Sequence, residues 1–283
     1  MNFIYIGDRV FPGFYRRHSV FENAINFFED GRLVSLVQQE IGNGPVNITL
    51  EGDLPLQAQT LKITETKAIL DSTKYIALPD SIYSSTLPEQ SFSLEIIKTN
   101  LLFLEDILKQ EPASLSLSVL IAPDRKNNFR GGFEKKYLEQ AQRASHLILE
   151  NLSYFGYPEM LKRLKQGIKN LKGLGYGLTP GGDDFIAGVL FALNFLEMID
   201  GVERTGLRRM MAYWAQSRNL LSAAFLNLAR EGFFFESLRN LVLALAGPDP
   251  NVVRTAARNL LKRGATSGAD LSAGFFLTLK KLI

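Results

Sequence analysis

The chain has 283 residues, with 32 lysines and arginines against 29 aspartates and glutamates, so its formal net charge is only +3. This near balance and the scattered placement of the basic residues give no reason to expect a nucleic-acid or membrane partner. The absence of cysteine excludes disulfides, thiolate catalysis and cysteine-ligated metals.

The start of the chain and its apolar stretches predict where the protein resides. Residues 1–5 lack the basic segment and long apolar run that mark a signal peptide. The most apolar stretch, residues 185–193, is much shorter than the roughly 20 residues that cross a bilayer. We therefore expect a soluble, cytoplasmic protein.

The first third of the chain is typical of β structure. Residues 46–50 alternate apolar and polar side chains, as a strand with one buried face should. Clusters of turn-forming residues separate further short β-prone runs at residues 33–37, 61–64, 68–70 and 75–78. One helix is expected within this region, at residues 20–28 after the candidate cap Ser19. Short strands at this spacing predict a small barrel or sandwich.

Helical periodicity begins after Pro88. From Ser93 onward, apolar side chains recur every three or four residues. Further helical patterns cover residues 134–152, 158–171, 184–198, 207–229, 235–245, 251–262 and 270–283. The sequence thus predicts an α+β protein, with a β-rich N-terminal domain at residues 1–90 and a mainly helical domain at residues 91–283.

A glycine-rich segment precedes the most hydrophobic of these helices. Residues 173–184 read Gly-Leu-Gly-Tyr-Gly-Leu-Thr-Pro-Gly-Gly-Asp-Asp. Glycines let a ligand approach the main chain closely, and threonine before proline predicts a helix start whose N–H groups and dipole favour an anion. The two aspartates, Asp183 and Asp184, can accept N–H bonds, hold a cation or act as a general base. The expected substrate-binding residues here are Gly175, Gly177, Thr179, Gly181 and Gly182.

The same frame recurs 86 residues later. Gly-x-Asp-x-x-Ala-Gly occurs at residues 182–188 and again at residues 268–274. Because the Ala-Gly pair gives a flat helix face, we infer that the two helix N-termini lie side by side and point Asp184 and Asp270 at one shared cleft. The second copy would add Thr266, Ser267 and Gly268 to the site. Glycine turns with aspartate near a helix start are also common caps, so a structural role is the alternative.

Asn219 and Ser222 are weaker candidates for substrate binding. They interrupt an otherwise apolar helical pattern, where buried polar groups must find partners. Those partners could be the glycine loops or a ligand, and a simple cap or a solvent-facing position explains them equally well. The loop at residues 122–132 is either a plain connection or a lid that brings Arg130 to an anion. The only two histidines have no recognisable metal spacing, and no Gly-x-Ser-x-Gly elbow indicates a serine nucleophile.

The glycine-rich motif at residues 173–184 resembles the signature of an uncharacterised bacterial domain family that includes AllH, a subunit of the oxamate carbamoyltransferase of allantoin breakdown. The resemblance spans nearly the whole chain, because the family's pattern is also matched at residues 18–21, 31–36, 44–45 and 264–270. Two positions depart from it: Gly181 stands where serine is frequent, and Asn219 where threonine is frequent. Some members carry a carboxylase label, which nothing in this sequence supports.

The resemblance implies carbamoyl or acyl transfer, carried out together with other subunits of one enzyme. We therefore expect a transferase subunit whose substrate is a small anion, such as carbamoyl phosphate or a carboxylate, or an amide. The glycine-loop amides would stabilise negative charge as it develops. Asp184 and Asp270, with Asp183 in support, would orient or deprotonate an attacking nitrogen.

Two other functions fit the same residues. The chain could be a non-catalytic subunit that uses the cleft to bind a ligand or to assemble with a partner chain. Alternatively, the three aspartates could hold Mg²⁺, which is the only cofactor that the sequence suggests. Ligand binding without turnover would identify the first case, and metal-dependent ligand binding the second.

Overall fold

The computed structural model describes residues 2–113, 115–153, 157–175 and 179–283. Its backbone groups into two compact units. One consists of Met1–Leu87 together with Phe233–Arg239, and the other of Pro88–Gly232 together with Asn240–Ile283.

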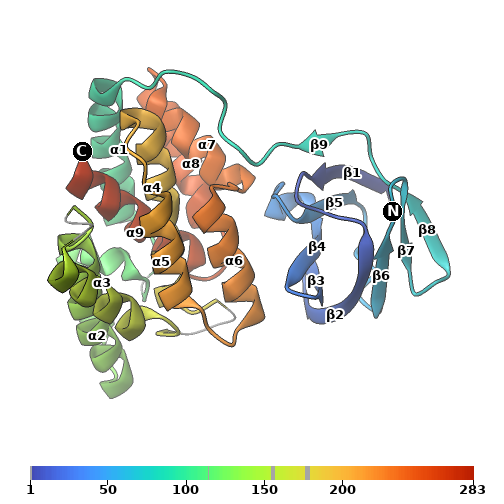
Figure 1. The fold of residues 1–283 in the computed structure, drawn as a ribbon, viewed down its shortest axis with the longest axis horizontal. Helices are drawn as coiled ribbons and strands as arrows, with labels where there is room; N and C mark the ends of the chain where they lie inside the picture. Colours follow the sequence, from blue (N-terminus) through green and yellow to red (C-terminus); the bar gives the residue numbers. More distant parts are fainter. Residues whose placement is uncertain (1, 114, 154–156, 176–178) are drawn as a thin grey trace. The chain divides into compact units, whose positions relative to one another are not determined.

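The first unit is a curled β half-barrel (Figure 1). Within the described residues its sheet has nine strands, in the order β8-β7-β6-β2-β3-β4-β5-β1-β9. Neighbours run antiparallel except for the pairs β4–β5 and β1–β9. The sheet curls far enough for β8, at one end of this order, to contact β1. The strands are β1 (Asn2–Gly7), β2 (Gly13–Phe21), β3 (Ala24–Glu29), β4 (Arg32–Gln38), β5 (Asn47–Glu51), β6 (Thr60–Ile63), β7 (Lys67–Leu70), β8 (Lys74–Ala77) and β9 (Ile82–Tyr83), with a short 3-10 turn η1 (Gln39–Ile41).

The predicted strands are confirmed as β4 to β8, and the apolar side chains that alternate along the sheet form a buried core. The helix expected at residues 20–28 is wrong, because β2 and β3 form a hairpin there. Aromatic and β-branched side chains in this stretch favour a pleated surface, and pairing of β3 with β4 buries Ile25 and Phe27 completely. Between β3 and β4, Asp30 and Gly31 both take positive φ, as the tight turn of a twisted hairpin requires.

Residues 233–239 belong to this first unit although the chain reaches them much later. The Tyr83 hydroxyl donates to the Phe234 carbonyl at 3.0 Å, and the Phe234 amide donates to the Ser85 carbonyl at 2.7 Å. The Glu236 carboxylate accepts from the Asn43 amide at 2.7 Å, while the Glu236 amide donates to the Asn43 carbonyl at 2.9 Å. The half-barrel is therefore completed by two separate parts of the sequence.

The second unit is built from helices around one buried helix, α4 (Figure 1). Every residue of α4 from Gly181 to Leu193 is buried, as expected of a helix that is hydrophobic on all sides. None of the helices in the described ranges combines the length and apolarity that a membrane crossing needs. The elements are α1 (Leu94–Gln110), η2 (Leu117–Leu120), η3 (Pro123–Asn128), α2 (Gly132–Glu150), α3 (Pro158–Leu171), α4 (Gly181–Asp200), α5 (Thr205–Ala215), α6 (Leu220–Glu231), α7 (Glu236–Ala246), α8 (Pro250–Leu261) and α9 (Ser267–Leu282). Of α7, only the residues from Asn240 onward belong to this unit.

The single helix expected at residues 207–229 is wrong, because the structure has two helices there. α5 ends at Ala215, and Asn219 caps α6 by accepting from the amides of Leu221 and Ser222, both at 3.1 Å. Such local bonds from a side chain to the backbone compete with a continuous helix.

The loop at residues 122–132 contains the short 3-10 helix η3. Arg130 lies on the surface there, and its Nε donates to the Asn127 carbonyl.

Candidate functional site

Helices α4 and α9 cross so closely that their backbones touch. A Cβ atom added at Gly188 of α4 would overlap the carbonyl oxygen of Leu271 on α9, and one added at Gly274 of α9 would overlap that of Phe185 on α4. These two contacts are equivalent, since both pairs of positions are related by the 86-residue repeat. Only glycine fits at either place. The prediction that the two repeated segments pack side by side is confirmed, and their packing is reciprocal.

The glycines before each helix also allow close packing of backbone on backbone. A Cβ atom at Gly182 would overlap the Leu171 carbonyl at the end of α3, and one at Gly268 would overlap the Leu260 carbonyl near the end of α8. The Gly182 amide donates to the Leu174 carbonyl at 2.8 Å, and the Gly268 amide donates to a carbonyl at 2.9 Å in the turn after α8. These two amides, which we expected to hold an anion, are thus bonded within the chain.

The two equivalent aspartates reach across to the first residue of the opposite helix. The Asp184 carboxylate accepts from the Thr179 hydroxyl at 3.2 Å, and that hydroxyl lies 3.1 Å from Ser267 Oγ at the start of α9. Asp270 Oδ2 lies 2.7 Å from the place of a Cβ atom at Gly181, the first residue of α4. Each carboxylate therefore lies near the positive dipole end of the other helix.

Burial governs the protonation of this pair, since Asp184 is 2% and Asp270 1% exposed. Burial raises the pKa of Asp270 to about 6, although the Leu117 amide, which donates to its Oδ1 at 2.6 Å, and the Thr266 hydroxyl lower it. Burial raises the pKa of Asp184 well above its ordinary value, and the negative charge of Asp270 raises it further. At neutral pH, Asp270 is therefore mostly ionised, and the raised pKa of Asp184 favours its protonated form more than in an ordinary aspartate.

Asp183 belongs to a different set of contacts. Its Oδ1 accepts from the Gly173 amide, just after α3, at 2.7 Å. Within the described residues, its Oδ2 has no hydrogen-bond partner, and neither has Ser222 Oγ on α6, although both atoms are buried. The pKa of Asp183 is raised by burial, and the nearby Ser222 hydroxyl and the charge of Lys172 lower it. Asp183 and Ser222 are thus close neighbours whose bonding capacity is not used.

Three expected site residues have other places or lie outside the described residues. Gly175 takes a φ of +118° and packs against the Gly181 amide, so its contact is with backbone. Asn219 acts as the cap of α6. Gly177 lies outside the described residues. The structure brings Thr179, Gly181, Gly182, Asp184, Thr266, Ser267, Gly268 and Asp270 together at the start of α4 and α9.

Sequence reasoning missed three residues at this centre. Tyr137 of α2 is buried, and its hydroxyl lies 3.0 Å from the place of a Gly181 Cβ atom. Leu117 contributes the amide that binds Asp270, and the charge of Arg263 acts on Asp184 and lowers its pKa. No motif contains Tyr137 or Leu117, and Arg263 lies just before the matched segment at residues 264–270, so only the fold could reveal their place at the site.

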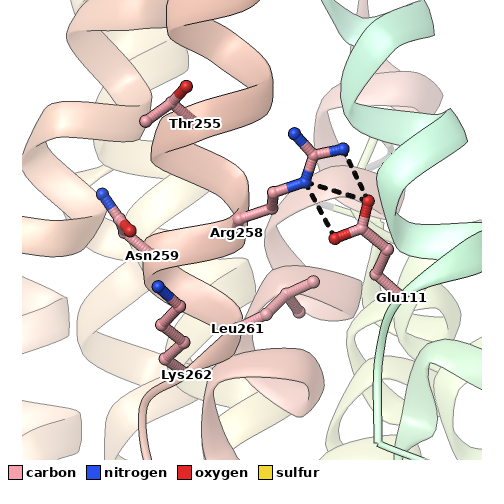
Figure 2. Close-up of a pocket in the computed structure, with 6 residues that line it drawn as sticks. All are labelled: Glu111, Thr255, Arg258, Asn259, Leu261 and Lys262. Atoms are coloured by element: carbon pink, nitrogen blue, oxygen red, sulfur yellow. Dashed lines mark hydrogen bonds and ion pairs between the residues drawn. The ribbon is translucent and has the colours of Figure 1, made fainter.

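The aspartates form no metal centre in the described part of the chain. There, no three histidine, aspartate or glutamate side chains are grouped as metal ligands. A cavity of about 380 Å³ lies where α8 faces the end of α1, and Arg258 points across it to the Glu111 carboxylate (Figure 2). None of the expected site residues lines this cavity. Its lining consists of Glu111, Thr255, Arg258, Asn259, Leu261 and Lys262.

Two family models match the chain. The model described as oxamate carbamoyltransferase subunit AllH matches residues 171–279, which include both helix N-termini and all three aspartates. The model of the AllH family N-terminal domain matches residues 11–91, which include most of the half-barrel. No solved structure matches the chain significantly.

Proposed function

The chain belongs to the AllH family, and on this premise we propose that it is a subunit of a carbamoyltransferase acting on a small carboxylate or amide. The description of the matching family names an oxamate carbamoyltransferase, so other subunits of that enzyme are its expected partners. The observation that carries the proposal is the pairing of Asp184 with Asp270 at two adjacent helix N-termini.

The chemistry of carbamoyl transfer needs an acceptor and a donor of protons. When the nitrogen of oxamate attacks the carbonyl carbon of carbamoyl phosphate, a C–N bond forms and the C–O bond to phosphate breaks. Phosphate leaves with the bonding electrons, and the nitrogen loses a proton. Asp270, ionised at neutral pH, would take up that proton, and Asp184 would hold a proton for the departing oxyanion. The positive ends of α4 and α9 would stabilise the negative charge that develops.

The test is carbamoyl transfer to oxamate by the chain assembled with its partner subunits. Asp270→Asn keeps the shape and can still accept from the Leu117 amide, but it cannot take up the proton. We expect turnover to fall by at least about 100-fold while ligand binding persists. Asp200→Asn, at the exposed end of α4, is the control and should leave turnover unchanged. Full turnover in Asp270→Asn contradicts the catalytic role.

A second function is favoured by a different observation. The Gly182 and Gly268 amides donate to carbonyls of the chain, and Asp183 and Asp270 accept from backbone amides. Such internal bonding suits a non-catalytic subunit that binds a ligand or supports assembly. In that case Asp270→Asn would lower the stability of the protein or its affinity for partner subunits, and the assembled enzyme would keep its turnover.

A further inference from the structure

Asp183 and Ser222 form a buried pair of acceptors apart from the Asp184–Asp270 pair. Asp183 is 2% and Ser222 1% exposed. In the part of the chain that the structure describes, Asp183 Oδ2 and Ser222 Oγ both lack a hydrogen-bond partner. Buried polar atoms are nearly always bonded, because an unmade bond costs the full loss of hydration. The Ser222 hydroxyl lies near enough to Asp183 to lower its pKa, but even with its one hydrogen turned to Asp183 Oδ2 it leaves acceptor lone pairs on both atoms without a donor. The two oxygens therefore indicate a place for a donor that comes from outside the chain.

The groups around the pair are bonded to other acceptors. The Gly173 amide donates to the other oxygen of Asp183 at 2.7 Å. The amides of Leu221 and Ser222 donate to the Asn219 side chain. The positive charge of Lys172 acts on Asp183, but its Nζ donates to the Gln216 carbonyl at 2.9 Å. Asp183, in the first turn of α4, and Ser222, in the first turn of α6, thus keep acceptor capacity that these neighbours do not use.

The internal repeat gives an independent reason to separate this pair from packing. In the second copy, Ala269 occupies the position that Asp183 has in the first. The helix pair α8–α9 makes the same close backbone contacts at its glycines and the same crossing without the acid. A carboxylate at this position is therefore not required by the packing that the two copies share.

We propose that Asp183 and Ser222 recognise the amino group of a primary carboxamide, –C(=O)NH₂, in the substrate. The nitrogen of such a group carries two N–H donors, which suffice for one bond to Asp183 Oδ2 and one to Ser222 Oγ. This inference rests on the proposed function, since carbamoyl phosphate and oxamate both carry the group. A methyl group in the same place leaves both buried acceptors unpaired, so the site rejects the methyl analogue.

Two pairs of ligands test this directly, because their members differ only by NH₂ against CH₃. Oxamate is compared with pyruvate, and carbamoyl phosphate with acetyl phosphate. Binding is measured by calorimetry with the full chain, alone and assembled with its partner subunits. The wild type should prefer the carboxamide in at least one pair by about tenfold or more. The pair that shows the preference identifies which of the two substrates occupies the site.

Two variants connect the preference to these residues. Ser222→Ala and Asp183→Asn should each reduce it to about twofold or less, because one acceptor is lost or replaced by a donor. Ser145→Ala, a buried serine of α2 whose hydroxyl donates to the Gln142 carbonyl, is the matched control and should keep it. Ser222→Ala should also leave the Tm unchanged or raise it, because it removes a buried hydroxyl without a bond, whereas Ser145→Ala should lower it.

The possible outcomes separate this inference from the proposed function. If the wild type binds both members of each pair equally, or if both variants keep the full preference, the recognition site is overturned and the proposed function stands. If Ser222→Ala lowers the Tm as much as Ser145→Ala, its hydroxyl makes a structural bond and the inference also fails. If none of the four ligands binds to the chain, either alone or assembled with its partner subunits, the inference and the proposed function both fail.

Discussion

The helix pairs α3–α4 and α8–α9 resemble each other in their backbone contacts and differ in their polar side chains. Both have a glycine with positive φ after the first helix, at Gly173 and Gly264. Both have a glycine, Gly182 or Gly268, at which the start of the second helix packs against the end of the first. Both also have a glycine, Gly188 or Gly274, where α4 and α9 cross. Gly173 and Gly264 are explained by their positive φ. The other shared glycines are explained by close packing, because the contact at each is with backbone of the same unit.

Several differences between the two copies concern groups that can form hydrogen bonds. The first copy has Asp183 where the second has Ala269, and Gly181 where the second has Ser267. The segment that links the two helices of a pair is also longer in the first copy, at residues 172–180, than in the second, at residues 262–266. The glycines that both copies keep are the ones that backbone packing needs, so Asp183, a polar group present in one copy alone, is a further candidate for a ligand.

The crossing glycines give the largest expected effect. Gly188→Ala and Gly274→Ala each place a Cβ atom on a carbonyl oxygen of the opposite helix, so each should lower the free energy of unfolding by at least about 3 kcal/mol. Gly132→Ala is the control, since no described atom lies within 4 Å of its Cβ position. Urea unfolding measures all three. A large loss in only one of the two crossing variants would break the equivalence of the copies.

The pH dependence of stability tests the buried pair. Because Asp270 has its pKa raised from 3.8 to about 6 in the folded protein, the stability it contributes is complete below about pH 4 and lost by about pH 6. The loss is about 3 kcal/mol at roughly 1.4 kcal/mol per pKa unit. Asp184, whose pKa is also raised, adds to the loss of stability as the pH rises.

Asp270→Asn should reduce this loss, because asparagine does not ionise. The free energy of unfolding is measured in urea between about pH 4 and pH 8, for the wild type and the variant under identical conditions. The difference between the two curves isolates Asp270 from other titrating groups. Parallel curves would mean that Asp270 ionises as readily in the folded as in the unfolded protein.

Ser267→Ala gives the smallest expected effect, and it removes a hydroxyl that the first copy lacks at the equivalent position, Gly181. Ser267 Oγ lies 3.1 Å from the Thr179 hydroxyl and lowers the pKa of Asp184. Its loss should cost about 1 kcal/mol of stability and raise the pKa of Asp184 further. Urea unfolding and carboxyl titration by infrared spectroscopy measure the two effects. No change in either would show that Ser267 takes no part in holding Asp184.

The sequence predicted what short-range patterns encode. Alternation predicted the strands, and the repeated Gly-x-Asp-x-x-Ala-Gly frame predicted that two helices pack against each other, since small residues at fixed spacing report close backbone contact. The same frame could not tell whether Gly182 admits a ligand or the Leu171 carbonyl, because a glycine permits both. Tyr137 and Leu117 come to the site from distant segments, and Asn219 breaks a helix through a cap that its periodicity conceals.

The place of residues 233–239 in the half-barrel has a consequence for the order in which the protein is made. The other residues of this unit end at Leu87, and the partners of Tyr83, Ser85 and Asn43 lie at Phe234 and Glu236. A ribosome that adds about 5–20 residues per second reaches them on the order of ten seconds after Leu87. During that interval the emerging half-barrel presents unpaired backbone groups to the cell, and it is closed only after most of the helical unit has been translated.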